Sequence, residues 1–411
     1  MLLVALSPWP AAAKQADEVF KDYGSALVQI KSINIESGQK SSIGTGFFIN
    51  DTGRIVTNYH VISGFVQTPD KYRLEYIDQK EQNFPVTVLA VDVINDLALL
   101  KAEREPKKYF DLAKDVPLKG EKLFALGNPH DLGMIVVPGT YNGIKQNSFY
   151  QRIHFTGSIN PGMSGGPTVN DKGSVIGINV ATAGNQIGFL VPVDKLWTMI
   201  DKFEADQQQD HSLQTSIGQQ LKDNQSLLYQ QLIDADWQLG NLGNASVPRK
   251  VADFMQCWGD SNKNKDKVLF TQASTNCAIQ DNVFLSGSFR TGKAQLGFSW
   301  IKSDKLNEMQ LSQLYERNLN QDYGRNNAAA DEVSNYHCSQ AWVENQSSSL
   351  LKGVTCVRAY RKYPGLFDVK FKSLLMGKEA QALVARYMLQ GVTQDTANAF
   401  YQKFVEQVSW K

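Results

Sequence analysis

Short runs of β-branched and aromatic residues, each followed by a turn signal, fill the chain from about residue 23 to residue 192. The clearest runs cover residues 26–30, 45–49, 54–58 and 86–91. Gly, Asn and Asp separate these runs where a mixed fold would have helical patterns, which is typical of all-β domains. This part of the chain is therefore predicted to be built almost entirely of β-strands.

Two segments of this region are predicted to be similar hairpins. Their turns are residues 50–53 (NDTG) and 170–173 (NDKG), and an apolar run lies on each side of both. Asn, Asp and Gly tolerate the positive φ that tight hairpin turns require. The repetition predicts two β-barrels in tandem, although N-D-x-G is also a common turn that could recur by chance.

The remainder of the 411-residue chain is expected to form at least one more domain, because the whole is too long for one ordinary domain. Leu196, Ile200 and Phe203 have helical spacing, and Leu or Ile recurs every four residues through much of 205–237, which predicts amphipathic helices. A solvated linker is favoured there over a coiled-coil surface, since heptad charge pairing is absent. Strand patterns at 283–289, 295–301, 354–361 and 367–371 alternate with helical patterns at 379–389 and 396–408, so the last region is predicted to be an α+β domain.

All four cysteines lie in this last region, at Cys257, Cys277, Cys338 and Cys356. We expect two disulfides, and sequential pairing is the simplest of the three connectivities. A zinc site is the weaker alternative, because no C-x-x-C spacing occurs and only His337 lies beside a cysteine. Each cysteine pair spans a polar loop with a strand beyond it, which hints at a duplicated unit.

The first nine residues are apolar and are followed by a small-residue stretch, residues 10–13, that resembles a cleavage site. The basic start of a signal peptide is missing, so an apolar tail is the alternative. We expect export to the periplasm or outside the cell, and no transmembrane segment, because no later stretch approaches about 20 apolar residues. With 42 Lys plus Arg against 41 Asp plus Glu, the chain has no charge excess that would indicate a nucleic-acid partner.

The small-residue segment 160–167 (NPGMSGGP) presents one serine, Ser164, between glycines. Backbone N–H groups of Gly162, Met163 and Ser164 could together bind the oxyanion that forms when a serine attacks a carbonyl. An ordinary glycine turn, or the nucleophile elbow of α/β-hydrolases, would have a similar sequence.

Two other residues have contexts suited to catalysis. His60 ends an apolar strand, and Asp96 lies within an apolar stretch, where a carboxylate needs a partner. The order His60, Asp96, Ser164 is that of the two-barrel serine proteases. An α/β-hydrolase needs its histidine after the serine, and only His211 and His337 follow Ser164, neither in a suitable context.

Over residues 24–196 the sequence resembles trypsin-like (chymotrypsin-fold) serine proteases, most closely the HtrA/Deg group of exported proteases. The matching strings are GTGFFI at 44–49, IVTNYHVI at 55–62, NDLALL at 95–100, ALGNP at 125–129, GMSGGP at 162–167 and IGIN at 176–179. The resemblance implies a double β-barrel at 14–196. The sequence patterns add a signal segment at 1–13, a helical linker at 197–238 and the α+β domain at 239–411.

The resemblance also implies residue roles. Ser164 would be the nucleophile, His60 the general base and then acid, and Asp96 the residue that orients the imidazole. The N–H groups of Gly162 and Ser164 would form the oxyanion hole, with Met163 as a third donor. Peptide bonds of protein or peptide substrates would be hydrolysed through an acyl-enzyme, with no cofactor and no metal. The group's trimers suggest a homo-oligomer.

The sequence departs from the family in two places. Met163 precedes the nucleophile where digestive proteases have an acid, and no Ile-Val-Gly-Gly start occurs, so activation by cleavage is not expected. No carboxylate-binding loop of a PDZ domain, the peptide-binding module common in the HtrA group, is recognisable after residue 196.

By resemblance, the floor of the substrate pocket lies near Ser158 and Ile159, and its wall near Val180 and Ala181. No Asp or Glu occurs in 156–159 or 179–183, so we expect cleavage after small or medium apolar residues.

The sequence is compatible with three functions. The favoured one is an exported serine endopeptidase with a C-terminal domain for substrate or partner binding. The alternatives are a binding or chaperone-like envelope protein with a latent site, and a structural envelope protein in which proteolysis is secondary.

Overall fold

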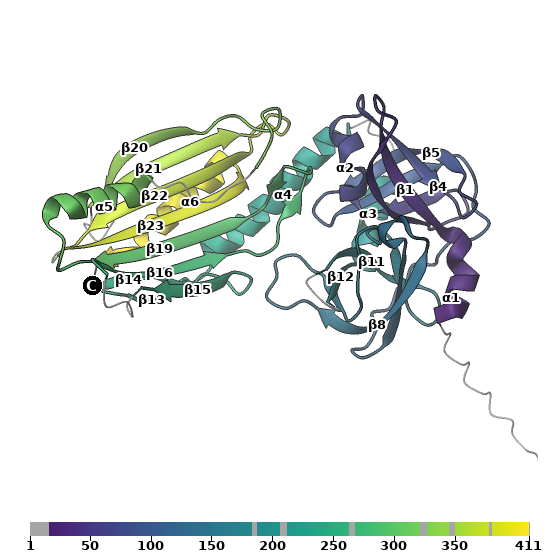
Figure 1. Cartoon of the computed structure of the whole chain (residues 1–411), viewed down its shortest axis with the longest axis horizontal. Coiled ribbons are helices and arrows are strands. Elements are labelled where there is room, and N and C mark those ends of the chain that lie inside the picture. The colour runs from purple at the N-terminus through teal and green to yellow at the C-terminus, as the bar shows by residue number, and fades with distance from the viewer. Residues whose placement is uncertain are drawn as a thin grey trace, which may run out of the picture. The chain divides into compact units, whose positions relative to one another are not determined.

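The computed structural model describes residues 16–182, 187–205, 212–262, 268–320, 327–344, 350–377 and 380–410. The predicted signal segment 1–13 lies outside these residues. The chain divides into two compact units (Figure 1). The first comprises residues 1–92, 96–145 and 151–209, and the second comprises 93–95, 146–150 and 210–411.

The first unit contains two closed six-stranded β-barrels, as the sequence predicts. The first barrel closes in the order β1 (Leu27–Asn34), β2 (Lys40–Phe48), β3 (Arg54–Thr57), β6 (Leu97–Ala102), β5 (Asn83–Asp92), β4 (Tyr72–Ile77). The second closes in the order β10 (Pro167–Val169), β11 (Val175–Thr182), β12 (Gly188–Pro192), β9 (Ile153–Phe155), β8 (Ile135–Ile144), β7 (Lys122–Gly127).

The two predicted hairpins are confirmed as β2–β3 and β10–β11, and their turns are built alike. Gly53 and Gly173 both have φ of +86°. The side-chain oxygens of Asn50 and Asn170 each accept the N–H four residues ahead, at 2.9 and 3.0 Å. The same local chemistry therefore turns the chain at equivalent places in the two barrels.

Short helices complete the first unit: α1 (Ala16–Tyr23), η1 (Gly24–Ala26), α2 (Tyr59–Gln67), η2 (Pro129–Asp131) and α3 (Val193–Ala205). Leu196 and Ile200 of α3 are buried with Phe47 of the first barrel and Ile178 of the second in one apolar cluster. The barrels therefore share a core. No described helix is long and apolar enough to span a membrane.

The second unit is built on a seven-stranded antiparallel sheet (Figure 1). Its order is β15 (Gln256–Ser261), β16 (Thr271–Ala278), β19 (Ala294–Lys302), β23 (Gln381–Val392), β22 (Phe367–Met376), β21 (Leu350–Ala359), β20 (His337–Glu344). The smaller elements are α4 (Leu213–Asp234), β13 (Gln238–Leu242), β14 (Ala245–Lys250), β17 (Val283–Phe284), β18 (Arg290–Thr291), α5 (Glu308–Asn320), α6 (Gln394–Glu406) and β24 (Ser409–Trp410). This is the α+β domain that the sequence predicts.

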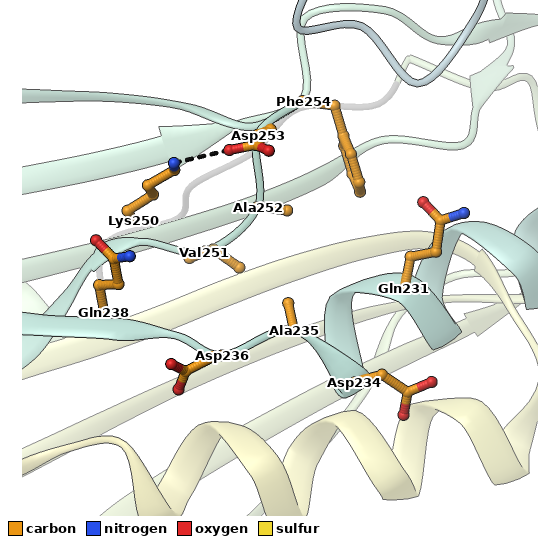
Figure 2. Close-up of a pocket in the computed structure, with 10 residues that line it drawn as sticks. All are labelled: Gln231, Asp234, Ala235, Asp236, Gln238, Lys250, Val251, Ala252, Asp253 and Phe254. Atoms are coloured by element: carbon orange, nitrogen blue, oxygen red, sulfur yellow. Dashed lines mark ion pairs between the residues drawn. The ribbon is translucent and has the colours of Figure 1, made fainter.

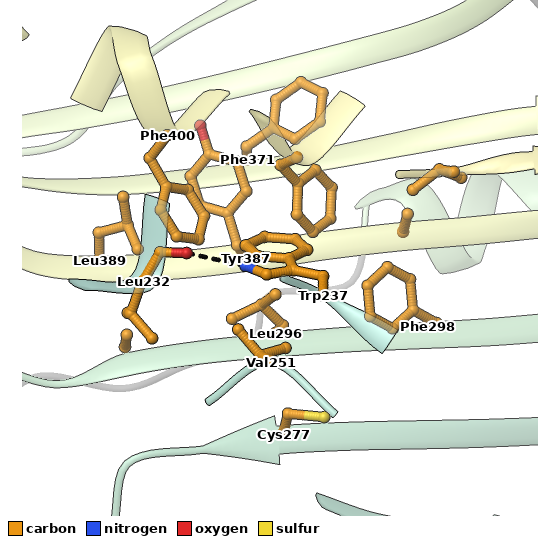
Figure 3. Packing of buried hydrophobic residues seen from close by; sticks show 14 of the residues in the cluster. Leu232, Trp237, Val251, Cys277, Leu296, Phe298, Phe371, Tyr387, Leu389 and Phe400 are labelled. Carbon is orange, nitrogen blue, oxygen red and sulfur yellow. Dashed lines mark hydrogen bonds between the residues drawn. The ribbon is translucent and has the colours of Figure 1, made fainter. Parts of the chain in front are cut away.

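Helix α4 contributes to the core of this unit. Leu228 and Leu232 are fully buried and pack with the sheet residue Tyr387 and the α6 residue Phe400. Figure 3 shows this cluster, in which Trp237 Nε1 donates to the Leu232 carbonyl at 2.8 Å. The segment 197–238, predicted as a helical linker, is divided between α3 of the first unit and α4 of the second.

One secondary-structure prediction is wrong. Residues 379–389 were predicted to be helical, but Gln381–Val392 forms strand β23. Eleven of its twelve residues are buried. Because side chains on both faces of β23 are buried, the strand lacks the apolar and polar alternation that would distinguish it from a buried helix. The helix predicted at 396–408 is confirmed as α6, whereas the strand predicted at 283–289 is limited to β17.

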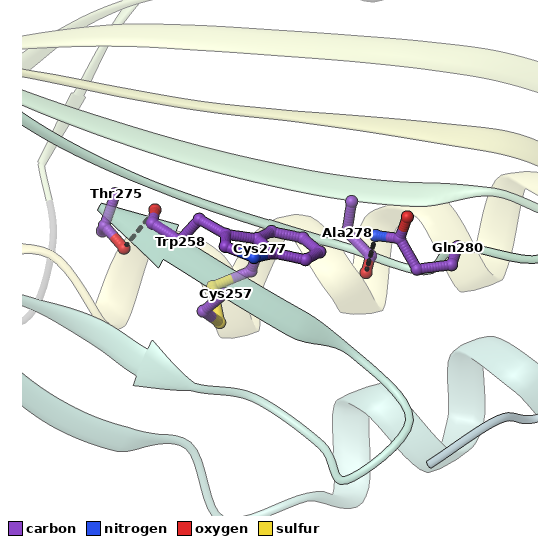
Figure 4. Close-up of a disulfide and its surroundings, with 6 residues drawn as sticks. All are labelled: Cys257, Trp258, Thr275, Cys277, Ala278 and Gln280. Carbon is purple, nitrogen blue, oxygen red and sulfur yellow. Dashed lines mark hydrogen bonds between the residues drawn. A yellow bond between two sulfur atoms is a disulfide. The ribbon is translucent and has the colours of Figure 1, made fainter. Parts of the chain in front are cut away.

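The cysteines pair sequentially, Cys257 with Cys277 and Cys338 with Cys356. Each pair joins residues directly opposite one another on antiparallel strands. Figure 4 shows the first pair, beside which Thr275 Oγ1 donates to the carbonyl of Trp258 at 3.3 Å. The two disulfides therefore join both edge strands of the sheet, β15 and β20, to their neighbours.

Candidate active site

His60 and Asp96 form a direct pair in the first barrel. His60 lies in the first turn of α2, where backbone N–H groups have no partner within the helix. The Asp96 carboxylate accepts the His60 N–H at Oδ1, at 2.8 Å, and its Oδ2 lies 2.6 Å from His60 Nδ1. One carboxylate thus holds both the main chain and the ring of the histidine.

The backbone of Asp96 is in an unusual conformation. Its φ is +62°, a region that residues other than glycine seldom adopt. The Asp96 carbonyl accepts the Asn58 side-chain amide at 2.7 Å and the Tyr59 N–H at 3.3 Å. Contacts with the start of α2 therefore hold a strained residue at the point where its carboxylate meets His60.

The environment of His60 favours its charged form. Burial lowers the pKa of His60, but the negative charge of Asp96 and the hydrogen bond that His60 donates to Asp96 raise it, and the net pKa is above the usual value of 6.5. The His60 side chain remains 29% exposed. With Nδ1 facing Asp96, Nε2 is the ring nitrogen left for proton transfer.

The loop that carries Ser164 belongs to the second barrel but is tied to the first. Thr45 of β2 is fully buried, and its N–H donates to the Ser164 carbonyl at 2.8 Å. Its hydroxyl donates to the Gly162 carbonyl, also at 2.8 Å. A single buried threonine therefore fixes the loop on both sides of Met163.

Close backbone packing joins the Ser164 loop to the segment that leads into His60. At Gly165, which has φ of +84°, a Cβ atom would lie 2.3 Å from Thr57 Oγ1 and 2.8 Å from the Asn58 N atom. The loop thus contacts the chain two residues before His60, the residue that pairs with Asp96. Ser164 Oγ donates no hydrogen bond to a described residue; catalytic hydrogen bonds often form only when substrate binds.

The peptide bond before Gly162 is held in one orientation. The Pro161 carbonyl accepts the His130 N–H at 2.9 Å. No cis peptide occurs among the described residues, so the Gly162 N–H points away from that carbonyl. Within the described chain this N–H has no acceptor.

The peptide bond before Ser164 is fixed in the same way. The Met163 carbonyl accepts the Gly166 N–H at 3.1 Å and the Asn179 side-chain amide at 3.3 Å. The Ser164 N–H therefore points to the opposite side, and it too donates to no described residue. The Met163 N–H, by contrast, donates to the Asn160 carbonyl at 3.0 Å within the turn, which leaves Gly162 and Ser164 as the two open donors.

Comparison with known families agrees with this geometry. Residues 44–178 match the family model described as "Trypsin-like peptidase domain". This part of the chain is a trypsin-like peptidase domain. The matched residues begin in β2 and end in β11, and they include the Ser164 loop. The predicted resemblance is therefore confirmed for the first unit.

Curated relatives of the peptidase domain belong to the predicted group. "Protease Do-like 1, chloroplastic" of Arabidopsis thaliana is 33% identical over 39% of this chain and 38% of its own length. A "Probable periplasmic serine endoprotease DegP-like" of Chlamydia pneumoniae is 33% identical over 40% of this chain and 35% of its own length. "Serine protease HTRA3" of Homo sapiens is 31% identical over 41% of this chain and 40% of its own length. The chain thus spans less than half the length of these relatives.

Solved structures similar to the chain include two proteases. A serine endoprotease from Yersinia pestis is 24% identical, with a TM-score of 0.40, over 48% of this chain and 69% of its own. An M. tuberculosis protease in its active form is 21% identical, with a TM-score of 0.41, over 49% of this chain and 94% of its own.

Asn179 of the peptidase domain organises the back of the loop. It is fully buried, and its side chain donates to the Leu126 carbonyl at 2.9 Å and accepts from Thr168 Oγ1 at 2.6 Å. Its main chain pairs with Gly165 and Gly166, each at 2.9 Å. The sequence placed Asn179 only beside the pocket wall. The signal for its wider role is a polar residue within an apolar strand, where burial demands hydrogen bonds.

The predicted pocket residues have mixed surroundings. Ile159 is 3% exposed and packs in the core of the second barrel with Met163. Ser158 and Val180 are half-buried. The side chain of Ala181 lies outside the described residues.

A separate hollow occurs in the second unit, lined by α4, β14 and the residues that follow them (Figure 2). Lys250 pairs with Asp253 there at 2.7 Å. The lining holds no serine, histidine or cysteine, so it offers no nucleophile or imidazole base, and we assign it no catalytic role.

Proposed function

We propose that the chain is an exported serine endopeptidase that uses Ser164, His60 and Asp96 as a catalytic triad. The observation that carries this proposal is the pair of N–H groups on Gly162 and Ser164, which donate to no described residue and each point away from a preceding carbonyl that is held by hydrogen bonds. Donors placed in advance for a developing oxyanion commonly supply the largest single part of such catalysis. A resting loop with a flipped peptide would lack one donor.

In the proposed reaction, Ser164 Oγ attacks the carbonyl carbon of the scissile peptide bond while His60 Nε2 takes the hydroxyl proton. The oxygen of the tetrahedral intermediate accepts hydrogen bonds from Gly162 and Ser164. The imidazolium, stabilised by Asp96, gives its proton to the leaving amine, and an acyl-enzyme remains. Water, activated by His60, then releases the carboxylic acid and the free serine.

Export and the role of the second unit belong to this proposal. Two disulfides fit an oxidising compartment, and relatives named as periplasmic proteases support the same location. The disulfide-joined sheet unit would bind the substrate or a partner.

The test uses the purified full chain, a fluorophosphonate probe and an unfolded protein substrate. We expect the wild type to be labelled and to hydrolyse the substrate, and Ser164→Ala to do neither. Ser174→Ala, in the β10–β11 turn, is the matched serine control and should retain both. A wild type that neither labels nor cleaves, yet suppresses aggregation as well as Ser164→Ala, would replace this proposal with the chaperone-like alternative.

Specificity is tested separately with a peptide library. The half-buried and buried pocket candidates carry no charge, so cleavage is expected after small or medium apolar residues. Cleavage mainly after Lys or Arg would contradict this assignment of the pocket.

A further inference from the structure

The loop between β7 and β8, residues 128–133, lies directly behind the oxyanion hole. The His130 N–H is the group that holds the Pro161 carbonyl. A Cβ atom on Gly162 would lie 2.3 Å from the Asn128 carbonyl oxygen and 3.0 Å from the His130 N atom. The orientation of the Gly162 N–H therefore depends on where this loop lies.

The loop is in a conformation that its own sequence does not favour. His130 and Asp131 are consecutive residues with φ of +52° and +62°. Left-handed backbone is unfavourable for residues other than glycine, and two in succession are uncommon. Such a conformation persists only when surrounding contacts hold it.

Apolar packing is not the main restraint on the loop. Leu132, its largest apolar residue, is 81% exposed. Within the loop, the Gly133 N–H donates to Asn128 Oδ1 at 2.9 Å, which closes the turn but does not attach it to the first barrel. The Asn128 N–H donates to Thr45 Oγ1 of the first barrel at 3.0 Å, but Asn128 precedes the two left-handed residues in the chain.

Asp131, the second of the two left-handed residues, supplies the other attachment of the loop to the first barrel. Its Oδ1 accepts Gln29 Nε2 of β1 at 2.7 Å, and its Oδ2 accepts Lys40 Nζ of β2 at 2.6 Å. Gln29 is 5% exposed, so one of the two partners is rigidly placed within the first barrel. The hydrogen bonds from Lys40 and then Gln29 lower the pKa of the Asp131 carboxyl, so it is charged at neutral pH.

We propose that Asp131 is a positioning residue for the oxyanion hole: through Gln29 and Lys40 it anchors residues 128–133, so that the His130 N–H holds the Pro161 carbonyl and the Gly162 N–H faces the substrate. The inference rests on the proposed peptidase function. When the anchor is lost, the strained loop relaxes, and the plane of the peptide between Pro161 and Gly162 becomes free to change its orientation through rotation about the single bonds on either side.

The experiment compares Asp131→Asn and Asp131→Gly with the wild type in the full chain, using a peptide substrate and a peptide boronate. Because the oxyanion forms only in the transition state, kcat should fall roughly tenfold to hundredfold, while KM changes less than about twofold. Boronate affinity should fall in parallel with kcat, and the affinity for the cleaved peptide product should not.

Asp131→Gly separates positioning from folding, because glycine adopts φ of +62° without strain. The relief of backbone strain at residue 131 offsets part of the loss of the two hydrogen bonds, so Asp131→Gly should stay folded at the assay temperature and still lose kcat. Lys40→Met should reduce kcat in the same direction, and adding it to Asp131→Asn should cost less than the two single effects combined.

Glu75→Gln is the matched control. Glu75 pairs with Arg73 in the same barrel at 2.8 Å, and its exposure resembles that of Asp131 (21% against 35%). It should leave kcat unchanged. The inference is overturned if stable Asp131→Gly retains wild-type kcat, or if its kcat loss leaves boronate affinity intact. A wild type without Ser164-dependent hydrolysis would instead refute the peptidase function itself, and the inference with it.

Discussion

Replacing Thr45 with valine tests whether one buried hydroxyl holds the nucleophile loop. Valine has nearly the shape of threonine, so the substitution leaves no cavity. It removes the group that donates to the Gly162 carbonyl at 2.8 Å and accepts the Asn128 N–H at 3.0 Å. Both hydrogen bonds join the second barrel to the first.

The expected magnitude follows from burial. Leaving a buried polar group without a partner costs about 1–3 kcal/mol. Asn128 is 8% exposed, whereas Gly162 is half-buried and can recover part of its loss in water. A total of about 2–3 kcal/mol is therefore expected. Since each kcal/mol shifts Tm by about 2–4 °C for a domain of about 150–250 residues, Tm of the peptidase domain should fall by roughly 4–12 °C.

The assay is thermal unfolding of Thr45→Val in a Ser164→Ala background, which prevents self-digestion. Thr45→Ser is the control, because it keeps the hydroxyl and loses only a methyl group. With Ser164 restored, Thr45→Val should also lower kcat more than it raises KM. If Thr45→Val melts within about 1 °C of Thr45→Ser and keeps its kcat, this account of the loop is wrong.

Three further predictions concern other parts of the molecule. Since neutral His60 is the proposed base and its pKa is raised, kcat/KM should fall as pH drops through a midpoint above about 6.5; a lower midpoint would contradict the effect of Asp96 on the pKa of His60. Gly165→Ala places a Cβ atom 2.3 Å from a backbone carbonyl oxygen of β2 and should reduce hydrolysis at least a hundredfold. Gly120→Ala is the control: Gly120 also has a positive φ, +98°, but its added Cβ atom would have no other atom within 4 Å, so this variant should remain active. Replacing both Cys338 and Cys356 by serine should lower the stability of the second unit by about 3 kcal/mol in denaturant titrations, and an unchanged midpoint would show that this disulfide is dispensable.

Features that depend on local sequence could be predicted. The turns at Gly53 and Gly173 need positive φ and a short polar side chain just before, and both requirements are visible as N-D-x-G. Sequential cysteine pairing was predictable because separations of 20 and 18 residues suit two adjacent antiparallel strands. The His60, Asp96 and Ser164 assignments rest on short motifs in a fixed order, and the structure pairs His60 directly with Asp96.

Features that depend on distant partners could not be predicted. Thr45 and Gly162 are separated by 117 residues, and Gln29 and Asp131 by 102. Polar residues of these types occur throughout the chain, and nothing local indicates which ones meet. The same limit applies to α4, whose apolar stripe was recognised although the sequence does not show which sheet would cover it.

The distribution of these contacts shows why the active site needs both barrels. His60 and Asp96 belong to the first barrel and lie 36 residues apart in sequence, so their pair depends on that barrel alone. The Ser164 loop belongs to the second barrel, yet its two outer carbonyls are held by Thr45 of the first. Contacts between residues so far apart in sequence form late, because a long chain segment must be closed before they contribute. We therefore expect the Ser164 loop, with the proposed nucleophile and oxyanion donors, to reach its position only after the two barrels have docked, and the His60–Asp96 pair to form before it.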